Sequence, residues 1–183
     1  MKKAFLLLLL CGTMGHLSAQ KYFTRTGNIS FSASSPLEPI EATTKTASCV
    51  IDAATGNMEF AVLITSFQFE KALMQEHFNE NYLESGRYPK GSFKGKIENI
   101  RDVKFNKEGN YKVRVSGTVE IHGVAKPVST TADFAVSAGK IKASSNFSVL
   151  LSDYNIKIPS AVSDKITKTA KISIKAELQE LRK

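Results

Sequence analysis

The sequence has no tryptophan, only two cysteines among 183 residues, and no apolar run long enough to cross a membrane as a helix. Its clearest apolar run, residues 4–10, is far shorter than the roughly 20 residues that a membrane-spanning helix needs. Cys11 falls in the leader that we describe below, so Cys49 alone would remain after processing, which excludes an internal disulfide. A lone cysteine in a strand-like stretch is typically buried and inert, and a catalytic thiol therefore has little support.

Sequence motifs for nucleophiles, phosphate binding and metals are also missing. There is no GxSxG elbow, no glycine-rich phosphate loop, no CxxC or HxH pair, and no pair of carboxylates at a useful spacing. We therefore expect no enzyme activity, no required cofactor and no metal site. The formal net charge is +8, but no clustered basic run accompanies it, which excludes a nucleic-acid partner. Lysines spaced singly along strands indicate a solvated sheet face; the alternative is a transient contact with an anionic membrane surface.

The N-terminus has the three parts of a secretory signal peptide. Two lysines precede the apolar run, and small or polar residues follow it up to Ala19 and Gln20. We predict a signal peptide over residues 1–19, a single domain over residues 20–183, and a periplasmic or secreted protein. A lipid-anchored alternative would need a small residue before Cys11, where Leu10 stands.

Alternation of apolar and polar residues with a period of two dominates the rest of the chain, and this pattern is typical of half-buried strands. It is clearest from Tyr111 to Ile121. The eight predicted strands are 29–33, 40–51, 58–67, 93–105, 111–121, 128–136, 141–151 and 170–178. Turn-forming residues stand between several of them, at 52–57, 106–110, 123–127 and 137–139. Such short links favour antiparallel neighbours. Residues 70–84 instead approach helical spacing, and residues 159–165 indicate a loop or a turn of helix.

The fold class is therefore all-β. Eight strands with one apolar face each can close into a barrel or fold as a two-layer sandwich, and periodicity does not choose between them. The interior of a small barrel is either filled by its own side chains or left open for one ligand. Gly95 and Gly117 fall among the inward positions, and their missing side chains favour a hollow interior.

Three stretches of the chain resemble the YceI-like family, exported bacterial proteins with a lipocalin-like barrel. They are SFQF (66–69) with LMQEHF (73–78) and YPKGSFKG (88–95), VSGT (115–118) with IHGVAKPV (121–128), and FSV (147–149) with DYNI (153–156). The resemblance implies an eight-stranded antiparallel lipocalin-like barrel with one short helix packed at the barrel. It also implies a polyisoprenoid or similar long apolar lipid as ligand, because some members bind one in the barrel interior.

We accordingly expect a non-catalytic periplasmic or secreted protein that holds an apolar lipid, an isoprenoid or acyl chain, inside its barrel. The alternative is an envelope protein-interaction module with a filled barrel and no lipid. A dimer is left open. The residues predicted to contact the lipid face inward or lie on the helix: Phe60, Val62, Ile64, Met74, Phe78, Phe93, Val113, Val115, Phe134, Phe147, Val149 and Tyr154.

Two polar sets carry alternative hypotheses. His77, His122 and Asp153 could form a metal or acid–base site, although His122 before Gly123 is more simply a turn residue bonded to backbone. Asp153 and Tyr154 could orient the polar end of a lipid, whereas local capping and packing explain them at least as well.

Overall fold

A computed structural model describes residues 20–33, 39–158 and 167–181 of the chain. The predicted signal peptide (1–19) and the predicted loop at 159–165 lie outside the described residues. Within the described ranges, no helix has the length and apolarity needed to span a membrane.

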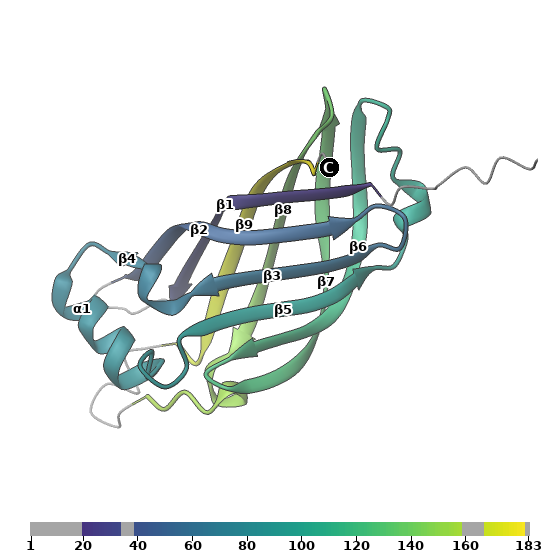
Figure 1. Cartoon of the computed structure of the whole chain (residues 1–183). Coiled ribbons are helices and arrows are strands. Elements are labelled where there is room, and N and C mark those ends of the chain that lie inside the picture. The colour runs from purple at the N-terminus through teal and green to yellow at the C-terminus, as the bar shows by residue number, and fades with distance from the viewer. Residues whose placement is uncertain (1–19, 34–38, 159–166, 182–183) are drawn as a thin grey trace, which may run out of the picture.

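Eight long antiparallel strands close into a barrel, as the resemblance implies (Figure 1). Hydrogen bonding runs in the order β1-β9-β8-β7-β6-β5-β3-β2, and a further pairing of β1 with β2 closes the ring. A two-residue strand, β4, adds to β2. The strands are β1 (Lys21–Ala33), β2 (Ile40–Asp52), β3 (Asn57–Leu63), β4 (Gln68–Phe69), β5 (Lys90–Ile97), β6 (Gly109–Ile121), β7 (Val124–Ser137), β8 (Lys140–Leu150) and β9 (Thr169–Glu180).

Strand β1 begins at Lys21, well before the predicted start at Ile29. The alternation is hidden there because the pairing register shifts between Thr24 and Gly27. The Thr24 hydroxyl accepts a hydrogen bond from the Thr26 N–H at 3.2 Å, which stabilises this bulge locally. Thr44 makes the same contact with Thr46 in β2, at 3.3 Å.

Strand β5 ends at Ile97, so the prediction of a strand up to residue 105 is wrong in its second half. Residues after it form a short 3-10 turn, Ile100–Asp102. This loop buries Val103 and stacks Phe105 on Tyr22 with ring centroids 5.2 Å apart. The apolar residues that looked like strand positions thus cover one end of the barrel.

Two hairpins use two-residue turns in which both residues have positive φ. These are His122-Gly123 (53° and 69°) and Ala138-Gly139 (49° and 73°). Such turns match the right-handed twist of the strands that they join. Strand β7 therefore starts at Val124, and Pro127 lies inside the strand rather than in the predicted turn. Its missing N–H is tolerated because β7 pairs with β8 only over Ala132–Ser137.

The predicted helix is present but divided. Helix α1 (Ala72–His77) continues into a π-helical turn (Phe78–Tyr82), and Leu83 follows it. Neither segment contains a buried residue, whereas Leu83 is buried. Together with β4, this segment lies at one end of the barrel, on the left in Figure 1.

The barrel interior has two halves of different character. We call the filled half the end around Tyr22, Val113, Phe134, Ile141 and Leu178, each at most 1% exposed. The hollow half is the opposite end, beside α1, where the buried cluster includes Ile64, Val119, Val149 and Ile156.

Candidate ligand-binding cavity

A cavity of about 160 Å³ occupies the hollow half. Strands β1, β3, β5, β6, β8 and β9 form its wall, and the segment that follows α1 closes it. The side chains that line it are aliphatic or aromatic, except those of Ser92 and Glu120. The apolar lining side chains include Ile29, Phe31, Phe60, Val62, Ile64, Phe67, Phe78, Leu83, Phe93, Val119, Ile121, Phe147, Val149, Leu151, Ile156, Ala170, Ile172 and Ile174.

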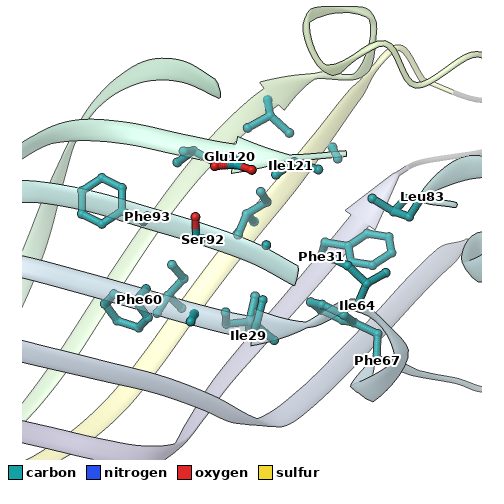
Figure 2. Close-up of a pocket in the computed structure, with 18 of the residues that line it drawn as sticks. Ile29, Phe31, Phe60, Ile64, Phe67, Leu83, Ser92, Phe93, Glu120 and Ile121 are labelled. Atoms are coloured by element: carbon teal, nitrogen blue, oxygen red, sulfur yellow. The ribbon is translucent and has the colours of Figure 1, made fainter. Parts of the chain in front are cut away.

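The cavity is elongated between two aromatic groups. Phe60 and Phe93 lie at one end, and Phe31 and Phe67 lie at the other, beside Leu83 (Figure 2). An apolar molecule in this space would contact rings at both ends and aliphatic side chains between them.

Four phenylalanines close the helical end of the cavity. The Phe78 ring stacks on Phe31 at 5.2 Å, and it contacts Phe69 at 5.0 Å and Phe67 at 5.8 Å. Phe78 is nevertheless only half-buried. The helical segment therefore contacts the barrel wall through this aromatic cluster, and Tyr82 packs beside it against the buried cluster of the hollow half.

A second cavity of about 70 Å³ lies next to the first, toward the filled half. Five residues line both cavities and form the partition between them: Phe60, Phe93, Val119, Phe147 and Ile174.

The glycine pair at the partition differs from the sequence-based expectation. Gly95 and Gly117 face each other across β5 and β6, as predicted for inward positions. A Cβ at either position would collide with the ring of Phe93. The space that the glycines leave is thus occupied by the Phe93 ring and does not itself widen the interior.

The two polar residues at the cavity wall point away from it. Ser92 and Glu120 are paired across β5 and β6, between inward-facing neighbours such as Phe93 and Val119. Successive side chains in a strand point to opposite faces, so Ser92 and Glu120 belong to the outer face. The described residues therefore present a purely hydrocarbon surface to the cavity.

The structure brings together most of the residues predicted to contact a lipid. Seven line the larger cavity: Phe60, Val62, Ile64, Phe78, Phe93, Phe147 and Val149. Val115 and Phe134 line the smaller one. Val113 is fully buried in the filled half, Tyr154 packs in the cluster of the hollow half, and Met74 is half-buried on α1, so none of these three reaches either cavity. Contact of this set with a ligand stays a prediction.

Other wall residues were missed for two reasons. Val119, Ile121, Ala170, Ile172 and Ile174 stand at inward positions of predicted strands, and the alternation alone would have found them. Leu83, Leu151 and Ile156 lie in irregular segments, where no period indicates a direction.

The polar residues considered for chemistry do not gather at one place. His77 is exposed on α1, whereas His122 is buried and bonded to Glu84 and to the backbone of Tyr154. In the described part of the chain, no group of three or more histidine, cysteine or acidic side chains could hold a metal ion. Burial raises the pKa of Tyr154, and the charge of Asp153 raises it further.

Cys49 is 1% exposed in the core of the filled half. Burial raises the pKa of its thiol far above the ordinary value, because the thiolate would lose its hydration there. The thiol is therefore a packing group, in keeping with the expectation from sequence.

The sequence profile of the YceI-like domain matches residues 18–178. The chain belongs to the YceI-like family. The matched range includes all eight barrel strands apart from the last residues of β9. Proteins of this family are generally exported. No curated protein sequence matches the chain significantly.

Solved structures with a similar fold include a polyisoprenoid-binding domain from Saccharophagus degradans implicated in plant cell wall breakdown. It has a TM-score of 0.77 and 14% identity, over 88% of this chain and 98% of that one. BcnA from Burkholderia cenocepacia has a TM-score of 0.68 and 16% identity, over 83% and 95% of the two chains. A YceI protein from Campylobacter jejuni has a TM-score of 0.55 and 19% identity, over the whole of both chains. At these identities the likeness shows the YceI barrel fold alone.

Proposed function

We propose that this protein is an exported, non-catalytic carrier that holds a long apolar lipid, a polyisoprenoid or an acyl chain, in the hollow half of its barrel. The observation that carries the proposal is the cavity of about 160 Å³ whose inward-facing side chains are all hydrocarbon. Membership of a family that has a polyisoprenoid-binding structural neighbour supports it.

Burial of hydrocarbon supplies the affinity. Each methylene removed from water contributes about 0.8 kcal/mol, so a chain segment of about ten methylenes contributes about 8 kcal/mol before the cost of association. Among the described residues, no polar side chain faces into the larger cavity, so it has no group to pair with a buried headgroup; the smaller cavity is lined in part by the hydroxyl side chains of Thr130 and Ser145. An unpaired polar group would cost roughly 1–3 kcal/mol in the larger cavity, so the polar end of the lipid stays at the mouth.

The size of the cavity adds a requirement. An apolar cavity of about 150 Å³ holds a molecule the size of benzene. A long chain therefore needs the space on both sides of the partition, and we propose that Phe60, Phe93 and Phe147 change rotamer when the chain enters. The carrier role needs no cofactor and no nucleophile.

A pair of neighbouring substitutions tests the site. Ala170 faces the cavity and Thr169 is exposed, so Ala170→Phe fills the cavity while Thr169→Phe adds the same ring outside it. Native mass spectrometry of protein purified without detergent, followed by titration with a polyprenol, measures lipid occupancy. We expect bound lipid in the wild type and in Thr169→Phe, and a loss of at least tenfold in affinity in Ala170→Phe.

Equal occupancy in the two variants would place the lipid elsewhere. No adduct and no polyprenol binding in any of the three proteins would instead favour an interaction module without a lipid. Export has its own test, because N-terminal sequencing of protein recovered outside the cytoplasm should begin at Gln20.

A further inference from the structure

His122 is a buried polar residue at the hollow half, and both of its ring nitrogens are engaged. It lies in the β6–β7 turn and is 8% exposed. Nδ1 lies 3.0 Å from the backbone oxygen of Tyr154, and Nε2 lies 3.1 Å from Oε1 of Glu84. The ring of Tyr88 packs edge-on against the imidazole at 4.6 Å.

The partners fix how many protons this site holds. A carbonyl oxygen only accepts, so Nδ1 must carry a hydrogen and donate it to Tyr154. A carboxylate also only accepts, so the contact with Glu84 needs a further proton, either on Nε2 or on the carboxyl group. A neutral ring has one N–H for two acceptors, so loss of that proton leaves one ring nitrogen bare against an acceptor oxygen, and one of the two contacts is replaced by repulsion between lone pairs.

The contacts of His122 join three segments that each supply a wall of the cavity. Ile121 precedes His122, Leu83 precedes Glu84, and Leu151 and Ile156 flank Tyr154; all four side chains line the cavity. Glu84, His122 and Asn155 also have positive φ values of 42°, 53° and 57°. Such conformations are uncommon for residues other than glycine and persist where surrounding contacts hold them.

Tyr88 packs against the same β6–β7 turn on a second side. A Cβ on Gly123 would collide with the Tyr88 ring, so glycine is required where the turn passes the ring. The guanidinium of Arg87 lies 5.1 Å from the centre of that ring. The β6–β7 turn is therefore packed closely against residues 84–88, and a change at His122 acts directly on the segment that follows the helix.

We propose that the His122–Glu84 pair is a proton-dependent latch that holds the segment after α1 against the β6–β7 turn at the helical end of the cavity, and that loss of its proton as pH rises speeds lipid exchange. This inference rests on the proposed carrier function. Histidine is suited to the role because its charge normally changes between pH 5 and 8.

Other charged and titratable groups near the latch come from each element packed against it. These are Glu84, Arg87 and Tyr88 after the helix, Asp153 and Tyr154 from the 3-10 turn Leu151–Tyr154, and Glu120 on the outer face of β6. Asp153, Arg87 and Glu120 are exposed, as is the Glu84 side chain at 46%, but Glu84 differs from them in lying within hydrogen-bond distance of the ring. Among the hydrogen bonds and ion pairs of the described residues, the ring contacts a charged partner only in Glu84.

Two variants separate the latch from ordinary packing. In Glu84→Gln the side-chain amide can accept from a protonated ring or donate to a neutral one, so the bond persists at every pH. In His122→Asn the turn is preserved, because Asn-Gly is a favoured pair for two positive φ values, while the ring and its bonds are removed. His77→Asn changes the exposed histidine of α1 and is the matched control.

The experiment follows transfer of a pyrene-labelled isoprenoid alcohol from the protein to phosphatidylcholine vesicles by stopped flow, from pH 5.5 to 8.5. We expect release from the wild type and from His77→Asn to become about tenfold faster at high pH. Release from Glu84→Gln should stay slow across the range, and release from His122→Asn should be fast throughout. A wild-type pH profile retained in Glu84→Gln or in His122→Asn would overturn the proposal.

A second readout does not depend on lipid. Amide hydrogen exchange of residues 83–88 and 151–156 in the lipid-free protein, corrected for the intrinsic effect of pH, should rise with pH in the wild type and stay flat in Glu84→Gln. A flat profile in the wild type overturns the latch. If the protein binds no isoprenoid but shows the expected exchange profile, the carrier function is wrong. The pH-dependent closure of the barrel end is then supported on its own.

Discussion

The filled and hollow halves of the barrel are built by the same eight strands and by the same kinds of inward side chain, yet one half is solid and the other holds a cavity. They differ in what covers them. The loop after β5 sends Val103 and Phe105 into the filled half, where Phe105 stacks on Tyr22. The helical segment beside the hollow half places only Phe78 and Leu83 at the cavity.

The same contrast appears in the hydrogen-bond ladders. Strands β6 and β7 pair along their whole length, from Gly109↔Val136 to Ile121↔Val124. Strands β7 and β8 pair only over Ala132–Ser137, which is the part of the wall that belongs to the filled half. Toward the hollow half, side-chain contacts take over, such as the bond from Ser145 to the Thr131 oxygen at 2.8 Å. The β7–β8 wall is thus held by fewer backbone hydrogen bonds toward the hollow half, and segments with fewer such bonds open more readily.

The largest expected difference between the halves concerns two phenylalanines. Phe134 is 1% exposed in the filled half, so Phe134→Ala should lower the free energy of unfolding by about 3–5 kcal/mol. Phe147 is half-buried beside existing space, and Phe147→Ala should cost only about 1–2 kcal/mol because fewer contacts are lost. Urea unfolding followed by circular dichroism measures both. Equal losses would mean that the two halves are equally well packed.

Two glycines of β5 allow packed and open positions to be compared within one strand. Gly95 lies under the Phe93 ring, so Gly95→Ala forces the ring or the backbone to move and should cost about 1–3 kcal/mol. Gly91 lines the cavity, where a Cβ would have ordinary contacts of 3.4–3.8 Å. Gly91→Ala should therefore change the free energy of unfolding by less than about 1 kcal/mol. A Gly91→Ala variant as unstable as Gly95→Ala would contradict the open wall at that position.

A third comparison concerns the pH dependence that Cys49 gives to the filled half. Its pKa is raised in the folded state, so the folded protein keeps the thiol proton after the unfolded chain has lost it. The contribution to stability is complete below the unfolded pKa of about 8.5 and is lost above it, at up to about 1.4 kcal/mol per pH unit.

Urea unfolding of the wild type and of Cys49→Ala at pH 8 and pH 10 isolates this contribution, because other groups titrate equally in both proteins. The wild type should lose more stability than the variant between the two pH values. The native thiol should also resist Ellman's reagent until the protein unfolds. Rapid labelling of Cys49 in the native protein would show that the filled half admits solvent.

Particular residues show how far sequence reasoning reached. The alternation from Tyr111 to Ile121 predicted strand β6 almost to the residue, because the polarity of each side chain there indicates the face of the sheet toward which it points. It failed at Phe105, an apolar residue near the end of a strand-like run that in fact plugs the barrel from a loop. It also missed Leu83 and Ile156, which reach the cavity from irregular backbone, and the bond between His122 and Glu84, which are 38 residues apart.

The sequence by itself determined most of the strands, the tight turn at Ala138-Gly139 and the family, since all of these depend on neighbours along the chain. Only the tertiary structure decided which half of the barrel is hollow and where the buried histidine finds its partners. A period of two says toward which face a side chain points, but the space in front of that side chain is set by segments that arrive from the far side of the barrel.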